Sequence, residues 1–441
     1  MSSFFTCALD KVLIHLCSCV GGEVNYARNQ AYVIIGTLVE ACLLTEEGQD
    51  KSKVKMHDVV REMALWIASD FGKDKERCIV KAGVGLREVP TVENWRSVRR
   101  MSLMDNMIKN ISESPDCPEL TTLLLQKNEI LNISMEISEL VSLRYLDLSG
   151  NRGIQQIFAC LLELEKLLYL NLEGTGLESV SGISNLSSLR TLRLQYNKIY
   201  SNVIKELKLL EHLEVVTIEI CSMFVADQLL NAYREANAIQ ELSIRYIENK
   251  SILTLLDMAV LSKLEIYKCE FAEIKVKRRT SLWNRSPTTP SFPNLSTVRL
   301  VFCHGVKDLT WLLFAPNLKV LYVENAAQVE DIINKEKAAN ILTEEKASTI
   351  IPFRKLEDFE VFFLPELRSI YWSPLPFPRL RIFRIYSCPN LRKLPLDSKS
   401  GSSIAGEELF IHREERDWID KVEWEDEATK ERFRRFNRPS N

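Results

Sequence analysis

The chain has 441 residues, a length that allows two or three domains and a sizeable core. Hydrophobic residues make up 46% and charged residues 27%, as in an ordinary globular protein, which excludes a long disordered chain. The formal net charge of -3 gives no reason to expect nucleic acid or an anionic membrane as a partner, and no apolar run is long enough to predict a membrane-spanning helix.

The 11 cysteines predict a reducing compartment and no disulfide framework, because their number is odd and they are scattered from Cys7 to Cys388. None of them forms a Cys-x-x-Cys pair or a cluster with zinc spacing, so we expect no metal site. The apolar stretch of residues 4–20 is interrupted by charges and lacks the positive region of a signal peptide. We therefore do not expect secretion.

Residues 1–90 show no repeat and predict a small unit of their own. The apolar run from Tyr32 to Leu44 predicts a buried helix, and Val54 to Met56 predicts a short strand. Asp58 is expected to cap a second helix, in which apolar residues recur at helical spacing. Helix, strand and helix in this order predict a winged-helix-like unit, and its basic content is too low to indicate DNA binding.

A leucine-rich repeat is the strongest signal in the chain. The template L-x-x-L-x-L-x-x-N/C is matched in LRYLDLSGN by Leu143, Leu146, Leu148 and Asn151. Equivalent units begin at Leu120, Leu143, Leu167, Leu189, Leu213, Ile239, Leu261, Leu295, Leu318, Leu356 and Leu380. The steps stay within the range of known repeats except after Leu261 and Leu318, where the longer spacing indicates insertions. The second insertion is charged and alanine-rich, which indicates partial helix.

Each unit of this kind supplies one short parallel strand and cannot bury its leucines alone, so that several must stack. The sequence therefore predicts an α/β fold: a horseshoe-shaped solenoid with parallel strands over residues 119–405, preceded by the small helical unit. The residue at the N/C position turns the chain out of the strand. Cysteine is small enough to occupy the same position as asparagine, so we expect Cys269, Cys303 and Cys388 to have a structural role and not a catalytic one.

Alternation along each strand directs the residues between the leucines outward, onto the concave face. Tyrosine and arginine, which are frequent among them, are residue types enriched at binding hot spots. We therefore predict a partner-binding face, against the alternative of a solvated sheet surface. It comprises Tyr145, Asp147, Tyr169, Asn171, Arg193, Gln195, Arg245, Tyr267, Arg299, Tyr322, Arg384 and Tyr386.

Residues 406–441 form a charged tail that contains Trp418 and Trp424. We expect these two rings to cap the hydrophobic end of the solenoid, because terminal repeats require such a cover. No local motif indicates a Ser/His/Asp or Cys/His catalytic arrangement, so no enzymatic activity is expected.

From about Ala27 onward the chain resembles plant nucleotide-binding leucine-rich-repeat immune receptors of the coiled-coil class. The first segment that carries the resemblance is KVKMHDVVREMALWIASD, which contains the triplet Met56-His57-Asp58. Two further segments, AGVGLREVP and SVRRMSL, resemble the family's bridge into the repeats. The segments CHGVKDLTWLLFAPNLKVLYV and LRKLPLDS resemble its late repeats. The resemblance implies that residues 1–90 are a remnant of the nucleotide-binding module, 91–118 the bridge, 119–405 the repeats and 406–441 a cap or tail.

In that family the triplet's histidine lies against the phosphates of bound ADP, a role that the resemblance transfers to His57. The alternative is an ordinary polar residue between strand and helix. No G-x-x-x-x-G-K-[ST] loop precedes it, since Gly72-Lys73 is followed by Asp74, so nothing in the sequence cradles phosphates or holds magnesium. We therefore expect no bound cofactor, although the complete family binds ADP or ATP, and we interpret the chain as a truncated receptor.

The leading functional hypothesis is a plant defence protein whose repeats bind a pathogen effector or a guarded host protein, or modulate a full-length receptor. Its expected partners are proteins, and its expected localisation is cytoplasmic. The alternative is a location at the membrane periphery, reached through those partners. One alternative is an ADP/ATP-dependent switch if the missing nucleotide-binding part is supplied elsewhere. Another is a fragment of an extracellular repeat receptor, which requires glycosylation at Asn132 or Asn185.

Overall fold

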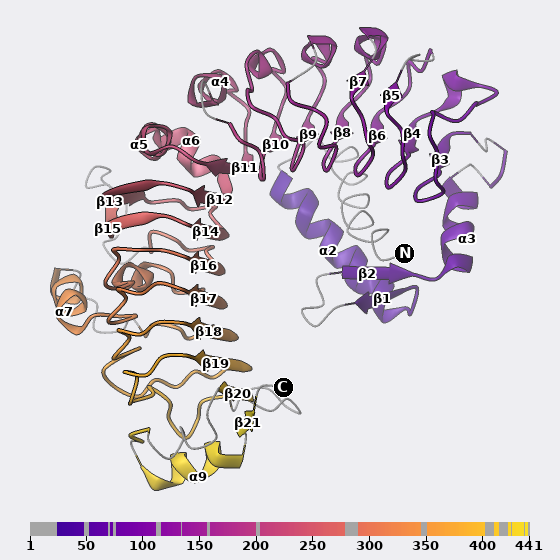
Figure 1. Ribbon diagram of the computed structural model, residues 1–441. Helices are drawn as coiled ribbons and strands as arrows, with labels where there is room; N and C mark the ends of the chain where they lie inside the picture. Colours follow the sequence, from indigo (N-terminus) through magenta and orange to yellow (C-terminus); the bar gives the residue numbers. More distant parts are fainter. Residues whose placement is uncertain are drawn as a thin grey trace. The chain divides into compact units, whose positions relative to one another are not determined.

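The computed structural model divides into two compact units, Met1–Val216 and Thr217–Asn441, which are considered separately (Figure 1). The described residues are 24–47, 53–68, 71–73, 76–111, 116–133, 135–156, 159–199, 203–277, 290–344, 351–401, 410–413, 422–424, 426–435 and 437–439.

The first unit begins with two helices around a hairpin. Helix α2 spans Val24–Glu40, strands β1 and β2 span Leu44–Glu47 and Lys53–Met56, and helix α3 spans Asp58–Ala68. The two strands pair antiparallel, with Leu44 opposite Met56. Helix α2 stops before Cys42, whose positive φ of 57° is incompatible with a continuing helix.

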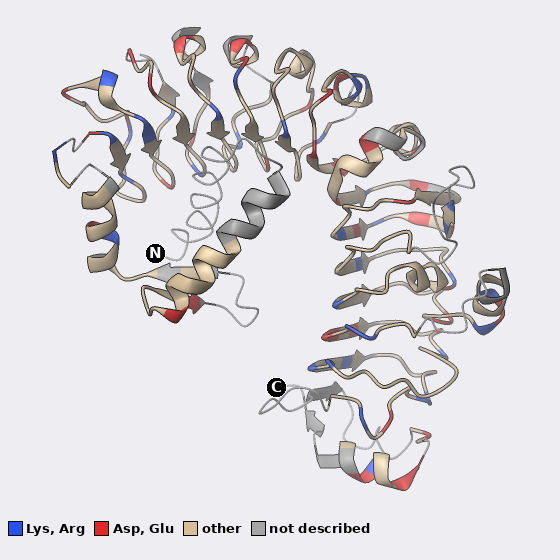
Figure 2. Ribbon diagram, turned by 180° about the vertical axis from the view of Figure 1, so that it is seen from behind, with Lys and Arg blue, Asp and Glu red and all other residues tan. Residues whose placement is uncertain are grey.

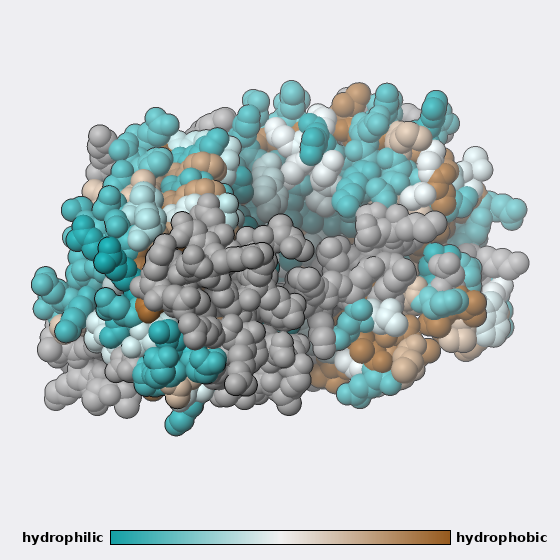
Figure 3. Space-filling model, turned by 60° about the horizontal axis from the view of Figure 1, so that its bottom comes forward, coloured by the Kyte–Doolittle hydropathy of each residue, from teal (hydrophilic) through white to brown (hydrophobic). Residues whose placement is uncertain are grey.

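The helix predicted over residues 32–44 ends at Glu40, with Leu44 instead beginning β1, and it is only partly buried. Its inner side places Ile35 against Leu44 and Val54 in one small cluster. Tyr32 and Val33 are 52% and 67% exposed, so the expectation of a buried helix is wrong for this side of α2. Figure 3 shows hydrophobic surface, in brown, at the right of the view, on the first unit. The continuous apolar run misled the prediction because it carries no sign of which side is covered.

A parallel sheet follows in the first unit. Its strands, in spatial order, are β3 (Cys78–Val80), β4 (Arg100–Ser102), β6 (Thr122–Leu124), β8 (Tyr145–Asp147), β9 (Tyr169–Asn171) and β10 (Thr191–Arg193) (Figure 1). Short helical turns and a second pair of strands lie between them: η2 (Trp95–Ser97), β5 (Asn110–Ile111), β7 (Asn132–Ile133), η3 (Met135–Glu139), η4 (Ala159–Glu163), η5 (Ile183–Asn185) and α4 (Val203–Leu209). The sheet therefore starts before the predicted repeat range of 119–405.

Stacked leucines form the core of this sheet. Leu146 lies opposite Leu170, which lies opposite Leu192, and all three are fully buried. Full burial of one such side chain stabilises the fold by about 1.5–3 kcal/mol. Since each leucine needs the next repeat to cover it, the stack explains why the units occur in series.

The second unit continues the same design with longer strands. Its main sheet runs in the order β11 (Val215–Ile220), β12 (Ile239–Arg245), β14 (Lys263–Tyr267), β16 (Thr297–Val301), β17 (Val320–Glu324), β18 (Asp358–Phe362), β19 (Ile382–Tyr386), β20 (Phe410–Arg413) and β21 (Asn437–Pro439). The other elements are α5 (Met223–Asn231), α6 (Tyr233–Ala238), β13 (Glu248–Leu256), β15 (Glu270–Lys277), η6 (Thr310–Phe314), α7 (Lys335–Glu344) and α9 (Glu427–Arg435). Each unit predicted from the repeat template contains one strand of the main sheets, which confirms the solenoid prediction.

Asparagine side chains close the turns of the first unit. The Asn151 amide donates hydrogen bonds to the carbonyl groups of Leu125 (3.0 Å) and Leu148 (2.7 Å), that is, to the preceding repeat and to its own. Its carbonyl oxygen accepts from the Ile130 backbone N–H at 3.2 Å. These bonds satisfy backbone groups that the strand ends leave unpaired inside the protein.

Cysteines take over this position in the second unit. The Cys303 thiol lies 3.3 Å from the carbonyl oxygen of Ile266, and the Cys269 thiol 3.5 Å from that of Ile244, in each case in the preceding repeat. The contacts correspond to those of the asparagine amides. The structural role predicted for these cysteines is confirmed. Because a thiol is a weaker hydrogen-bond donor than an amide, backbone hydrogen bonds contribute more to holding the turn in these repeats.

We predict that these buried thiols are inert in the folded protein. Burial raises the pKa of Cys269 to about 11 and that of Cys303 to about 12, so almost none of either is thiolate near neutral pH. Cys42 is exposed and serves as the internal control. After brief iodoacetamide treatment, mass spectrometry should find Cys42 alkylated and the other two modified only in urea; equal labelling of all three in the native protein would contradict the buried turn.

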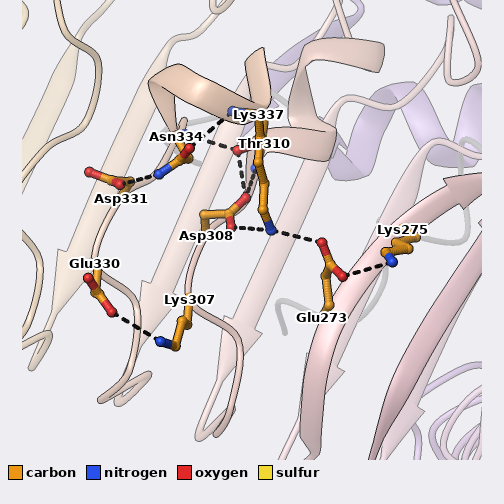
Figure 4. A network of polar contacts seen from close by, with 9 residues as sticks. All are labelled: Glu273, Lys275, Lys307, Asp308, Thr310, Glu330, Asp331, Asn334 and Lys337. Atoms are coloured by element: carbon orange, nitrogen blue, oxygen red, sulfur yellow. Dashed lines mark hydrogen bonds and ion pairs between the residues drawn. The ribbon is translucent and has the colours of Figure 1, made fainter. Parts of the chain in front are cut away.

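The second predicted insertion is partly helical, as expected, and is attached by a polar network (Figure 4). The Lys337 ammonium of α7 lies 2.8 Å from both a Glu273 and an Asp308 carboxylate oxygen. Asp308 also accepts the Thr310 hydroxyl at 2.6 Å, and Asn334 donates its backbone N–H to Thr310 at 2.9 Å. Burial opposes ionisation of Glu273, but hydrogen bonds from two lysines outweigh it and lower the pKa of this carboxyl.

The C-terminal region carries one of the two expected cap rings. Trp424 stacks on Phe433 of α9 with ring centroids 5.7 Å apart, and the Phe433 side chain is fully buried. Trp418 lies outside the described residues. The tail also contributes β20 and β21 to the sheet, which the repeat template did not predict.

Candidate functional site

The second unit presents an ordered row of polar and aromatic side chains on one face of its main sheet. In β14, β16, β17, β18 and β19 the central strand residues alternate between buried and accessible side chains, as the repeat requires. The accessible positions include Arg245, Tyr267, Arg299, Tyr322, Arg384 and Tyr386, which we call the strand-face surface. Figure 2 shows acidic and basic residues together on these strands.

Arg245 holds the first part of this surface together. Its guanidinium lies 3.2 Å from a Glu219 carboxylate oxygen and 3.5 Å from one of Glu265. The same group lies over the Tyr267 ring, 5.3 Å from the centroid. Ion pairs on both sides and a ring beneath fix the side chain, so it enters any complex with little further loss of rotamer freedom.

Tyr322 occupies the middle of the strand-face surface. The Arg299 guanidinium lies 4.6 Å from its ring centroid, and the Phe362 ring lies at 5.4 Å on the other side. The Tyr322 hydroxyl donates to Glu324 at 2.7 Å. Burial, together with this hydrogen bond to a carboxylate, raises the pKa of Tyr322 to about 12, so the hydroxyl stays protonated and remains a hydrogen-bond donor.

Arg384 and Tyr386 complete the row. Arg384 forms an ion pair of 2.7 Å with Glu360, its register neighbour on β18. Tyr386 meets the edge of Phe363 at a centroid distance of 5.4 Å. Burial and the nearby Glu360 raise the pKa of the Asp358 carboxyl on the same strand. All six predicted site residues of the second unit are therefore accessible and lie on one face.

The predicted site residues of the first unit differ. Tyr145, Asp147, Asn171 and Gln195 are at most 5% exposed, so the expectation that they face solvent is wrong. Asp147 accepts hydrogen bonds from its neighbours in adjacent repeats, at 3.2 Å from Gln126 and 3.1 Å from Asn171.

Aromatic packing accounts for the rest of this burial. Tyr145 packs in one cluster with Ala82, Met104 and Leu124, and Tyr169 borders the cluster. Tyr169 and Arg193 remain partly accessible, with the guanidinium 6.0 Å from the ring centroid. The template gives the side of the sheet on which a residue lies, but these side chains bury one another across the strands.

Sequence reasoning missed a second row of residues, at the position immediately before the N/C position of each repeat. Except in the repeat that begins at Leu213, where Ile220 still belongs to β11, these residues have a positive φ: Asp105, Lys127, Gly150, Gly174, Tyr196, Tyr246, Lys268, Phe302, Asn325, Phe363 and Ser387. Glycine adopts this conformation without strain, whereas a bulky residue there costs about 1 kcal/mol or more. This row could have been recognised in the sequence, because aromatic residues occupy in some repeats the position that glycine occupies in others.

The triplet Met56-His57-Asp58 sits at the start of α3. Met56 packs against the small cluster below α2, while His57 is exposed; the side chain of Asp58 is outside the described part. The His57 Nδ1 atom accepts the Val59 backbone N–H at 3.3 Å, and its carbonyl accepts the Arg61 N–H at 2.9 Å. His57, rather than Asp58, is therefore the helix cap, because Asp58 already belongs to the first turn.

We predict from this arrangement that the chain alone does not bind ADP. The Nδ1 atom of His57 is occupied by the helix end, and the sequence provides no phosphate-binding loop beside it. Titration calorimetry with millimolar ADP should give no binding heat, for the wild type and for His57→Ala alike. Binding to the wild type that is lost in His57→Ala would instead support the nucleotide-dependent alternative.

None of the helices within the described ranges combines the length and the apolar character needed to cross a membrane.

Comparison with protein families matches residues 83–402 to a family described as a leucine-rich repeat region. Two curated relatives from Arabidopsis thaliana are both 52% identical: disease resistance protein RPS5 over 437 residues (92% of this chain, 48% of the relative) and disease resistance protein SUMM2 over 442 residues (93% and 48%). The chain spans about half the length of the curated relatives it matches. Among solved structures, the internalin InlF of Listeria monocytogenes is similar with a TM-score of 0.45 and 16% identity, covering 85% of this chain and 93% of its own.

Proposed function

Because this chain belongs to the leucine-rich-repeat family and its curated relatives are disease resistance proteins, we propose that it acts in plant defence by binding another protein through its strand-face surface. The partner is a pathogen effector or a guarded host protein, met in the cytoplasm. Modulation of a full-length immune receptor is the second form of the same activity. The function that we propose for the strand-face surface is protein binding, without a catalytic step and without a cofactor.

One observation carries this proposal: arginine and tyrosine side chains are fixed in place on one accessible face of the second unit. Tyr322 with Arg299, and Arg384 with Glu360, are each held by a partner within the protein. Arginine and tyrosine dominate binding hot spots because they combine apolar area with hydrogen-bonding groups. Side chains that are already fixed lose less entropy on binding, which raises affinity.

Co-immunoprecipitation from infected plant tissue tests the proposal. The tagged full chain is compared with the double variant Tyr322→Ala/Arg384→Ala and with Lys307→Ala, which removes an exposed lysine that pairs with Glu330 on the surface. We expect a pathogen or host protein to be recovered with the wild type and with Lys307→Ala, and recovery to fall at least about tenfold with the double variant. Equal recovery with all three proteins contradicts a role of this surface.

A further inference from the structure

A cluster of three aromatic rings lies beside one lysine next to the strand-face surface. Tyr246 and Tyr267 meet edge to face with centroids 5.7 Å apart, and Tyr267 and Phe302 do so at 6.1 Å. The Lys268 ammonium lies 5.4 Å from the Tyr267 centroid and 5.8 Å from that of Phe302. Three consecutive repeats therefore contribute one ring each, and two of these rings, Tyr267 and Phe302, lie against the Lys268 ammonium; we call this group the Lys268 cluster.

Three residues of this cluster occupy the turn position with positive φ that follows the strand in most repeats. Tyr246, Lys268 and Phe302 have φ values of 58°, 49° and 54°, at the position that Gly150 and Gly174 occupy in the first unit. Tyr246 is 56% and Phe302 37% exposed, so neither ring fills the interior. Because a positive φ recurs at this position in most repeats, the feature that distinguishes the cluster is the pair of accessible rings that neighbouring repeats carry there.

The charge around the cluster is unbalanced. Arg245 is matched by Glu219 and Glu265, but in the part of the chain that the structure describes no carboxylate lies within ion-pair distance of Lys268 or Arg299. Both side chains are exposed. Two cations beside aromatic rings favour carboxylate groups, since ring edges also carry partial positive charge.

We propose that the Lys268 cluster, together with Arg299, binds an acidic segment of a partner protein in which carboxylate side chains alternate with apolar ones. The carboxylates pair with Lys268 and Arg299, and the apolar side chains pack against Tyr246 and Phe302. Glu219 and Glu265 balance Arg245 on the same face, so the surface carries too little net positive charge for a continuous polyanion, which disfavours nucleic acid. This inference rests on the proposed protein-binding function and specifies the chemistry of the partner.

A peptide selection on the full chain tests this proposal. Phage that display random peptides are selected on the immobilised protein, and the enriched sequences are synthesised with a fluorescein label and titrated by fluorescence polarisation. We expect enrichment of Asp and Glu next to Leu, Phe or Trp. Lys268→Glu should weaken these peptides at least about tenfold, because it replaces an attractive charge with a repulsive one.

Two matched pairs of variants separate binding from folding. Phe302→Gly removes the ring and relieves the positive φ, so it should weaken binding without loss of stability, whereas Tyr196→Gly, at the same repeat position in the first unit, should leave binding unchanged. Lys127→Glu is the corresponding control for Lys268→Glu, since Lys127 has the same position and a φ of 54° in the first unit.

Four results overturn the inference: enrichment of basic or neutral peptides, no enrichment, acidic peptides that bind Lys268→Glu as well as the wild type, and peptides whose binding depends on Tyr322 and Arg384 alone. The last of these leaves the proposed function standing, because the strand-face surface still binds protein. Equal recovery of the partner by the wild type and by the double variant Tyr322→Ala/Arg384→Ala in the co-immunoprecipitation is the separate result that removes the proposed function itself.

Discussion

Replacement of Leu264 by alanine should lower the free energy of unfolding of the second unit by about 2–5 kcal/mol. The Leu264 side chain is fully buried and lies in register between Leu242 of β12 and Val298 of β16. The neighbours are held by their own strands and cannot collapse into the space, so the variant keeps a cavity in addition to losing apolar burial.

Urea unfolding followed by circular dichroism measures the loss in the Leu264→Ala variant, and hydrogen exchange locates it. Because each repeat contacts only its neighbours, amides of β12, β14 and β16 should lose protection first. Leu209→Ala is the matched control, since Leu209 ends α4 with 59% of its side chain exposed, and it should change stability by less than about 1 kcal/mol. Equal effects of the two variants would contradict the stacked core.

Replacement of Asn197 by alanine should destabilise the first unit by about 3–5 kcal/mol, a large effect for one polar residue. The buried amide donates to the carbonyl groups of Leu172 (2.7 Å) and Leu194 (3.1 Å). Its oxygen accepts the Gly176 and Leu177 backbone N–H groups, both at 3.0 Å. Alanine leaves these groups buried without partners, and each costs about 1–3 kcal/mol.

Two comparisons test this explanation of Asn197. Asn390→Ala removes an exposed asparagine whose amide donates to the Pro365 carbonyl at 2.7 Å, and it should cost less than about 1 kcal/mol. Asn197→Cys introduces the residue that Cys303 provides at this position in the second unit. It should fall between wild type and alanine, because a thiol replaces part of the donor function but not the two accepted hydrogen bonds. Urea midpoints in the order wild type, cysteine, alanine would support this explanation; no difference would refute it.

The repeat fold was predictable because its signal is carried by many residues at fixed spacing. Strand after strand lies where the leucines placed it, as with Leu146, Leu170 and Leu192, and Cys303 has the structural role expected of it. Strand β3 was missed because Ile79 is its only residue at a leucine position of the template, and Glu76 and Lys81 occupy the other two. A single unit without its leucines cannot be recognised by periodicity.

The candidate site was predictable only in part, for a physical reason. Alternation indicates on which side of a strand a residue lies, and this is sufficient for Arg299 and Tyr322, which remain accessible. It does not indicate what packs against that side, so Tyr145 and Asp147 were wrongly expected to face solvent. The Lys268 cluster depends on backbone conformation after the strand, which the leucine pattern does not encode.

Site-specific photo-crosslinking in infected plant tissue measures contact at the strand-face surface most directly. The full chain carries benzoylphenylalanine in place of Tyr322 or, as the control, in place of the exposed Leu209. We predict a covalent adduct with one defined pathogen or host protein at position 322 and none at position 209. Adducts of equal yield at the two positions, or none at 322 while the partner still co-precipitates, would show that the partner binds elsewhere.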